Sequence, residues 1–183
     1  MARPAVFIDR DGTLNVEKNY LHRFEEWEWV PGAIDAVRKF NAAGFLVIVV
    51  SNQAGVARGL YPESDVVSLH ARVDEELAKA GARIDAYYFC PHHPEHGEGN
   101  DCTCRKPLPG MLIQAKEEWN IDFARSWMIG DKLIDIQAGQ AAGIRSILVA
   151  TGYGSSEVNQ LPQGVPFVEN LLAASDLILG LSQ

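Results

Sequence analysis

Short polar side chains follow several apolar runs of this chain, at the point where each run ends. Asp9, Ser51 and Asp131 each come directly after such a run. If the runs are strands of one parallel sheet, the three residues lie on the same edge of it. Each could instead cap the turn or helix that follows, and for Ser51 alone capping is the better interpretation. For the three together we predict a functional site.

The segment from Asp9 to Thr13 adds a second carboxylate, Asp11, two residues after the first. Two carboxylates so close together can serve one anionic group only with a cation between them, and Mg²⁺ prefers such oxygen ligands. Asp131, at the end of a neighbouring strand, would complete the cage of carboxylates. The spacing therefore predicts a magnesium site in which Asp9 attacks a phosphorus atom in line.

Two further side chains suit the same reaction. Lys106 could offset the charge of a phosphoryl group, and Ser51 could donate a hydrogen bond to it. Phosphoryl transfer depends on positioned charge more than on elaborate covalent chemistry. We therefore predict that Asp9, Asp11, Ser51 and Lys106 form the catalytic set.

Sulfur and nitrogen ligands gather in a second place, a loop predicted over residues 90–107. Cys90 and His92 open this loop, and Cys102 and Cys104 lie near its end. Four ligands of this kind make a closed tetrahedral zinc site. Because the chain has three cysteines, an odd number, and two of them are one residue apart, a disulfide framework is not expected.

Other interpretations of this loop stay open. His93 and His96 are competing ligands, although they break the symmetry of the two pairs. Without a metal, the segment would be three reduced cysteines and a surface histidine in a flexible loop. With zinc bound, we expect the metal to take no part in the chemistry and to fold the loop that presents Arg105 and Lys106 to the substrate.

Apolar runs alternate with helical patterns along the chain. This alternation indicates an α/β fold with a Rossmann-like, doubly wound, mainly parallel sheet, in a single domain over residues 1–183. Trp27 and Trp29 alternate with glutamates, which suits a hairpin flap, and no gap has room for a large cap domain. The predicted strands are 5–8, 45–50, 84–89, 127–130, 144–149 and 165–168, and the predicted helices are 31–43, 62–80, 109–119 and 171–179.

Charge and composition limit the classes of partner. The 183 residues carry a formal net charge of −8, which repels nucleic acid and anionic lipid. The longest apolar run, residues 45–50, is too short to cross a bilayer, and the N-terminus has no signal-peptide pattern. We expect a cytoplasmic monomer that binds a small molecule and neither nucleic acid nor a membrane.

The motifs together resemble those of the haloacid dehalogenase superfamily. In order they are residues 9–14 (Asp-Arg-Asp-Gly-Thr-Leu), 51–53 (Ser-Asn-Gln), Lys106, and 130–132 (Gly-Asp-Lys) with Asp135. The resemblance implies that Asp9 is the nucleophile and that Asp11 protonates the leaving oxygen and later deprotonates water. It also implies Mg²⁺ held by the carboxylates of Asp9 and Asp131 and by the backbone carbonyl of Asp11. A carboxyl with the two roles of Asp11 must titrate near the working pH.

Within the superfamily, the Cys/His loop resembles a branch with two known activities. One removes the 7-phosphate of a heptose 1,7-bisphosphate in lipopolysaccharide synthesis, and the other hydrolyses histidinol phosphate. Residues 56–59, 87–94 and 106–111 favour the heptose substrate, and histidinol phosphate or another small phosphomonoester is the alternative. By the same resemblance, the substrate pocket is lined by Glu17, Lys18, Asn19, Tyr20, Ser51, Asn52, Gln53, Ala54, Arg105 and Lys106. Lys18 could equally be a solvated surface charge.

Two other classes of function compete with a hydrolase. A zinc-stabilised binding module would be expected to have lost Asp9, Asp11 or Lys106, and all three are present. A phosphotransferase or mutase would also form a phospho-enzyme on Asp9, but it would need a lid that excludes water. Because the gaps between the motifs have no room for such a lid, the sequence predicts a phosphatase.

Overall fold

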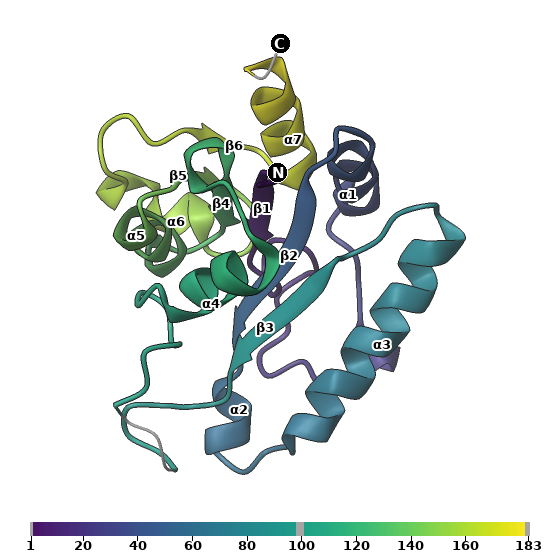
Figure 1. Ribbon diagram of the computed structural model, residues 1–183. Helices are drawn as coiled ribbons and strands as arrows, with labels where there is room; N and C mark the ends of the chain where they lie inside the picture. Colours follow the sequence, from purple (N-terminus) through teal and green to yellow (C-terminus); the bar gives the residue numbers. More distant parts are fainter. Residues whose placement is uncertain (1, 98–100, 182–183) are drawn as a thin grey trace.

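A computed structural model of the chain describes residues 2–97 and 101–181 and contains a six-stranded sheet (Figure 1). Residues 98–100, part of the predicted zinc loop, lie outside the described residues, as do residues 1, 182 and 183. Neighbouring strands are parallel throughout, in the order β3-β2-β1-β4-β5-β6. The strands are β1 (Ala5–Ile8), β2 (Leu46–Asn52), β3 (Ala86–Cys90), β4 (Trp127–Gly130), β5 (Arg145–Val149) and β6 (Phe167–Val168).

Strand β1 lies inside the sheet, where the chain reverses its direction of growth. It pairs with β2 on one side, with Ile8 opposite Val49, and with β4 on the other, with Ile8 opposite Ile129. The chain builds outward through β2 to β3 and then returns to place β4 on the opposite side of β1. In open parallel sheets, ligands bind in the crevice beyond the carboxyl ends of the strands at such a reversal. The topology therefore points to the residues that follow β1 and β4.

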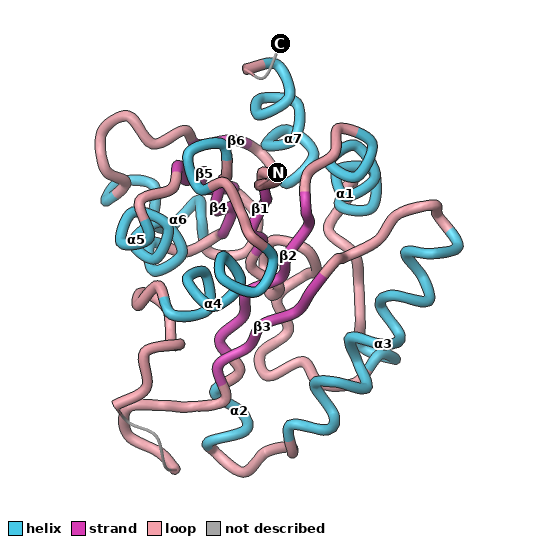
Figure 2. Tube along the Cα trace, in the orientation of Figure 1, coloured by secondary structure: helices cyan, strands magenta, loops and turns pink. Residues whose placement is uncertain are grey.

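Helices cover both faces of the sheet (Figures 1 and 2). One face packs against α1 (Ala33–Ala42), α3 (Glu63–Lys79) and α7 (Leu171–Gly180), and the other against α4 (Gly110–Trp119) and α5 (Leu133–Ala142). Because side chains alternate along a strand, Val6 and Ile8 of β1 join the first core and Ala5 and Phe7 join the second. The shorter helical segments are η1 (Phe24–Glu26), α2 (Ala54–Ala57), η2 (Phe123–Arg125), α6 (Gly154–Glu157) and η3 (Val158–Gln160).

The α/β fold predicted from the sequence is confirmed. Strands β1 and β4 have the predicted bounds, and the ends of the other predicted elements move by a few residues. The one shift that matters for the site is in β2, which continues through Ser51 to Asn52. Ser51 therefore lies within the strand and does not follow it. Among the described residues, the segments that connect β1 to β2 and β2 to β3 contain helices and loops and no cap domain.

The segment between β1 and α1 contains η1 and a short antiparallel pairing around Asn15 and Trp29. The Val16 N–H donates to the Glu28 carbonyl (2.8 Å) and the Val30 N–H to the Leu14 carbonyl (3.2 Å), which agrees with the predicted hairpin flap. The side chains of Leu14 and Leu21 are buried in the first core. Because these two leucines turn inward, the flap packs against the first core.

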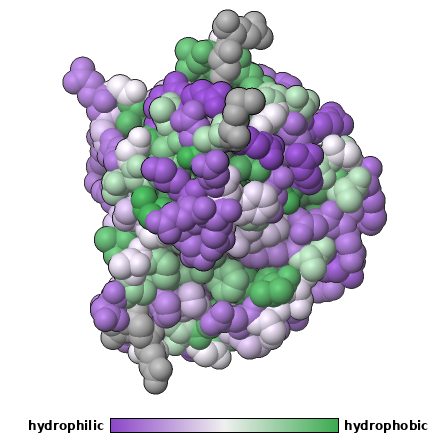
Figure 3. Space-filling model, viewed as in Figure 1, coloured by the Kyte–Doolittle hydropathy of each residue, from purple (hydrophilic) through white to green (hydrophobic). Residues whose placement is uncertain are grey.

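On the face shown in Figure 3, apolar residues are scattered among hydrophilic ones. The apolar side chains of the sheet are enclosed instead in the two cores between sheet and helices. None of the described helices is both long enough and apolar enough to span a lipid bilayer.

Candidate active site

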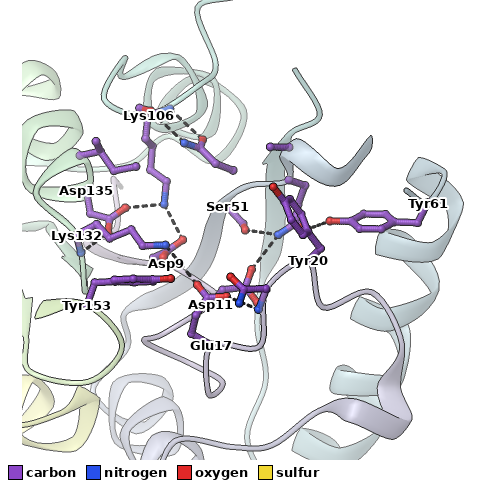
Figure 4. Close-up of a pocket in the computed structure, with 15 residues that line it drawn as sticks. Asp9, Asp11, Glu17, Tyr20, Ser51, Tyr61, Lys106, Lys132, Asp135 and Tyr153 are labelled. Atoms are coloured by element: carbon purple, nitrogen blue, oxygen red, sulfur yellow. Dashed lines mark hydrogen bonds and ion pairs between the residues drawn. The ribbon is translucent and has the colours of Figure 1, made fainter. Parts of the chain in front are cut away.

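A cavity of about 210 Å³ opens at the edge of the sheet where β1 and β2 end (Figure 4). Its walls come from the loop after β1, the end of β2, the segment before α4 and the start of α5. The residues that line it are Asp9, Asp11, Glu17, Asn19, Tyr20, Ser51, Asn52, Gln53, Ala54, Tyr61, Lys106, Lys132, Ile134, Asp135 and Tyr153.

Three buried carboxylates meet at the ends of β1 and β4. Oxygens of Asp9, Asp131 and Asp135 lie within 4.8 Å of one another. One Asp131 oxygen accepts a hydrogen bond from the Tyr153 backbone N–H (2.9 Å), whereas Oδ1 has no hydrogen-bond partner. Burial, followed by the charges of Asp9 and Asp135, raises the pKa of Asp131 to about 8. Since buried like charges are costly without a cation, this cluster fits a hard divalent ion such as Mg²⁺.

Lys106 places a buried positive charge in the cavity wall. Its ammonium group lies 2.7 Å from an oxygen of Asp9 and 2.7 Å from an oxygen of Asp135, and it donates a hydrogen bond to the Val50 carbonyl (2.8 Å). Burial would lower the pKa of Lys106, but the charges of Asp135 and Asp9 outweigh burial and raise it. Lys106 is therefore a fixed cation beside Asp9. Asp135, whose role could not be predicted from the sequence, holds Lys106 in this position.

Asn52, the last residue of β2, fixes the backbone of Lys106. The Asn52 side chain donates to the Lys106 carbonyl (3.0 Å) and accepts from the Lys106 N–H (3.0 Å). These two bonds join the end of a rigid strand to the last part of the Cys/His loop. The sheet therefore sets the position of Lys106, although Lys106 itself lies in the loop.

Asp11 is held separately from the carboxylate cluster. Arg10 pairs with both of its oxygens (3.1 and 3.0 Å), and Asn15 and Gln53 each donate a further hydrogen bond. Burial favours the neutral carboxyl, but Arg10 and these hydrogen bonds outweigh it and lower the pKa of Asp11. The arrangement thus differs from the expectation that Asp11 titrates near the working pH, because the sequence did not reveal that Arg10 turns inward and is completely buried.

Two glycines make room for the Asp131 side chain. Gly12 and Gly152 both have positive φ angles (+92° and +57°), which favour glycine. A Cβ atom on Gly12 would lie 2.3 Å from Asp131 Oδ2, and one on Gly152 would lie 2.1 Å from the same atom. The carboxylate is therefore packed directly against two stretches of backbone.

Most of the residues predicted to contact substrate line the cavity. Two do not: Lys18 pairs with Glu28 (2.9 Å), and Arg105 donates to the His92 carbonyl (3.0 Å) and lines a neighbouring cavity of about 200 Å³. Because Lys106 lines both cavities, Arg105 is still close to the first one. Those that line the first cavity are Glu17, Asn19, Tyr20, Ser51, Asn52, Gln53, Ala54 and Lys106.

The sequence does not predict Tyr61 or Tyr153 at the site, and it places Lys132 in the motif 130–132 without a defined role. The Lys132 ammonium lies 3.3 Å from a Glu17 oxygen and 4.5 Å from the centre of the Tyr153 ring, on the side of the cavity opposite Tyr61 (Figure 4). Lys132 directly follows Asp131 and lines the cavity, as its position in the motif indicates. No pattern in the sequence distinguishes either tyrosine from a packing residue.

The predicted zinc ligands lie together beside this cavity. Ligand atoms of Cys90, His92, Cys102 and Cys104 are all within 4.8 Å of one another. Burial favours the neutral thiol of Cys102, but the Arg105 N–H and the neighbouring thiols outweigh it and lower its pKa to about 7. The three cysteines are free thiols.

Three separations among these side chains are close to the edges of a metal tetrahedron. The Cys90 sulfur lies 3.7 Å from the Cys102 sulfur and 3.7 Å from His92 Nδ1, and the Cys104 sulfur lies 3.4 Å from the same nitrogen. With zinc–ligand distances of about 2.3 Å to sulfur and about 2.0 Å to nitrogen, a tetrahedron has edges of roughly 3.5 to 3.8 Å. The ligand set and its spacing therefore fit Zn²⁺.

Comparisons with known proteins agree with this geometry. Residues 103–174 match a family described as HAD-hydrolase-like. Proteins named D-glycero-beta-D-manno-heptose-1,7-bisphosphate 7-phosphatase are similar to the chain: that of Yersinia pestis is 48% identical over 153 residues (81% of each chain), and that of Pasteurella multocida 42% identical over 183 residues (98% of each).

Two solved structures of D,D-heptose 1,7-bisphosphate phosphatases also resemble the chain. The protein of B. bronchiseptica, complexed with magnesium and phosphate, has a TM-score of 0.89 and 34% identity, covering 97% of this chain and 98% of the other. That of Burkholderia thailandensis has a TM-score of 0.74 and 32% identity, covering 97% and 99%.

Proposed function

Because the chain belongs to the haloacid dehalogenase-like (HAD) hydrolases and has relatives named heptose-1,7-bisphosphate 7-phosphatase, we propose that it removes the 7-phosphate of D-glycero-β-D-manno-heptose 1,7-bisphosphate. By the same relationship, the reaction belongs to the synthesis of the heptose of lipopolysaccharide. The observation that supports a phosphatase most strongly is the buried group of Asp9, Asp131 and Asp135 beside Lys106, at the reversal point of the sheet.

In the proposed reaction, a carboxylate oxygen of Asp9 attacks the phosphorus of the 7-phosphate. A bond forms between Asp9 and phosphorus while the bond from phosphorus to the sugar oxygen breaks. Lys106, 2.7 Å from Asp9, offsets the negative charge of the phosphoryl group, and the Ser51 hydroxyl donates to one of its oxygens. The products of this first step are the free sugar hydroxyl and an aspartyl-phosphate.

Asp11 is the proposed acid and base. It gives its proton to the departing sugar oxygen and then takes a proton from the water that attacks the aspartyl-phosphate. Arg10 favours the ionised form of Asp11, whereas the dianionic phosphate of a substrate, placed in the cavity beside it, favours the protonated form. Substrate binding would therefore favour the protonated form of Asp11, which can act as the acid.

We propose that Mg²⁺ is held by the carboxylates of Asp9 and Asp131 and by the backbone carbonyl of Asp11. When bound, it supplies positive charge that lets an anionic nucleophile approach an anionic phosphate. Asp135 is paired with Lys106 (2.7 Å) and also accepts from the Lys132 N–H (3.0 Å), so we assign it to positioning Lys106.

We also propose that Cys90, His92, Cys102 and Cys104 bind a structural zinc ion, which supports the loop that carries Arg105 and Lys106. The single-domain, monomeric and cytoplasmic state expected from the sequence remains part of the proposal. Free thiols are consistent with a reducing compartment, and the net charge of −8 disfavours nucleic acid as a partner.

The test is phosphate release in the presence of Mg²⁺, with the two anomers of heptose 1,7-bisphosphate and histidinol phosphate compared side by side. We expect a strong preference for the β heptose and loss of the 7-phosphate alone, followed by ³¹P NMR. Preference for histidinol phosphate would keep the mechanism and overturn the substrate. Release from none of the three would overturn the substrate class.

A further inference from the structure

Tyr61 enters the cavity from the segment between α2 and α3, and the reaction described above leaves it without a role. Its side chain is buried, and its hydroxyl donates to Gln53 Oε1 (3.0 Å). Burial raises the pKa of Tyr61 to about 12, so the phenol stays protonated at neutral pH. The hydroxyl is therefore a permanent donor to the Gln53 carbonyl.

The other end of the Gln53 amide faces the reacting groups. Its nitrogen donates to Asp11 Oδ2 (3.0 Å) and to the Ser51 hydroxyl oxygen (2.7 Å). A primary amide has two N–H donors and one carbonyl, and here both N–H groups and the carbonyl have partners. A flipped amide would place its carbonyl against the Asp11 carboxylate. The Tyr61 hydroxyl and the Asp11 carboxylate thus select the same orientation of Gln53.

This orientation determines what the Ser51 hydroxyl can do. Because its oxygen accepts the hydrogen bond from Gln53, its own hydrogen is free to point toward another acceptor. Ser51 lines the cavity next to Asp9 (Figure 4). The available acceptor in a substrate complex is an oxygen of the phosphoryl group.

Packing holds Tyr61 in place on both sides. A Cβ atom on Gly55 would lie 2.3 Å from the Tyr61 ring, so the ring rests directly on the backbone of α2. The His22 ring stacks on it with centroids 4.5 Å apart and planes 13° apart. The ring is enclosed between the loop after β1 and α2, and the hydroxyl cannot swing away from Gln53 without disturbing both.

We propose that Tyr61 is a positioning residue for phosphoryl transfer, which acts through Gln53 to aim the Ser51 hydroxyl and to hold the Asp11 carboxylate. The inference rests on the proposed phosphatase function of this cavity. It predicts that the phenol hydroxyl affects the rate of the chemical step, in particular when the leaving group needs a proton from Asp11.

The test compares Tyr61→Phe with Tyr87→Phe. Tyr87 is a matched control because its hydroxyl also donates to a side chain, Asp74 (2.8 Å), but lies outside the cavity. Each variant is assayed with heptose 1,7-bisphosphate, which has a poor leaving group, and with p-nitrophenyl phosphate, which has a good one. We expect kcat of Tyr61→Phe to fall about 10-fold on the heptose and about 3-fold on the aryl phosphate, with KM changed less than about twofold. Tyr87→Phe should leave both rates unchanged.

A loss of equal size on the two substrates, or no loss beyond that of Tyr87→Phe, would overturn the proposal. If Tyr61→Phe unfolds at a lower temperature than the control, Gln53→Met provides a second test. Since Tyr61 acts through Gln53, adding Tyr61→Phe to Gln53→Met should cause no further loss of kcat, whereas losses that multiply would overturn the proposal. Wild-type protein that cleaves histidinol phosphate and not the heptose would remove the substrate assignment alone, and the same comparison then uses histidinol phosphate.

Discussion

The catalytic cavity and the Cys/His cluster are neighbours, yet the chain positions their side chains in different ways. In the cavity, Asp9 and Asp131 follow two paired strands at the centre of the sheet, so the backbone hydrogen bonds of β1 and β4 set their separation. In the cluster, Cys90 ends an edge strand, but His92, Cys102 and Cys104 lie outside every strand and helix of the described residues. The first site is held by the fold, whereas we propose that the second is held by a zinc ion.

Because of this difference, the two sites should respond differently to substitution. Removing a charged group from the cavity should stop the chemistry and leave the fold, because the strands remain paired. Removing a ligand from the cluster should loosen the loop and reach the chemistry only indirectly, through Arg105 and Lys106. Substitutions that separate these effects test the comparison.

The largest effect is expected from Asp9→Asn. An amide cannot attack phosphorus as a carboxylate does, so turnover should fall by at least about a thousandfold. The substitution also removes one of three mutually repelling buried carboxylates while it keeps the shape of the side chain, so the thermal midpoint should change by only a few degrees. Phosphate release and a thermal melt measure the two. Near-normal turnover would contradict the assignment of the nucleophile.

A smaller effect is expected from Cys102→Ser. Loss of one thiolate should weaken zinc binding, and activity should fall by roughly 10- to 100-fold as the loop loses its support. The circular dichroism of the sheet and helices should be unchanged. Thr103→Ser is the control, since Thr103 lies between two ligands and is not one itself. Normal turnover by Cys102→Ser with no bound zinc would show that the loop does not need the metal.

The smallest expected effect is a dependence of folding stability on pH. His70 of α3 is buried and stacks on Tyr87 with centroids 4.2 Å apart, and burial, followed by the charge of Arg10, lowers its pKa to about 3. In the unfolded chain the pKa is about 6.5, so between these values the unfolded state binds a proton that the folded state does not. The stability contributed by neutral His70 should be fully present above about pH 6.5. Below that pH, the free energy of unfolding should fall by up to about 1.4 kcal/mol per pH unit.

Urea titrations at pH 7.5, 6 and 5 measure this dependence. In His70→Phe, which keeps an aromatic ring, the part of the slope due to this group should disappear. If wild type and variant lose stability in parallel as the pH falls, another group is responsible. The zinc ligands also gain protons at low pH, so the comparison is made between proteins with equal zinc content.

Much of the positioning scaffold could be predicted from the sequence. Residues 5–8 and 127–130 are continuous apolar runs, each followed directly by an aspartate, and such runs identify buried parallel strands and their ends. The Cys/His spacing also predicted a site, because few roles other than metal binding bring those residue types together. The structure consequently brings Asp9 and Asp131 together at one edge of the sheet. It also brings the four sulfur and nitrogen side chains of the loop together, as the spacing predicts.

The parts that could not be predicted depend on long-range contacts. Arg10 looks like a surface charge in the sequence, but its guanidinium is buried against Asp11 and the Leu21 carbonyl (2.7 Å). The packing of the flap could not be predicted for the same reason, since Leu14 and Leu21 are buried in a core built by distant elements. The partner of Asp135, Lys106, is also distant in sequence and was visible only as a separate motif.

The two glycines beside Asp131 have a consequence for how this sequence can vary. Neither Gly12 nor Gly152 carries a reactive group, but adding a single methyl at either would displace an oxygen of Asp131. In a complete scan of single substitutions, both positions should therefore be as intolerant as the reactive aspartates themselves. Tolerated substitutions are thus limited by side-chain size at Gly12 and Gly152 and by charge at Asp131.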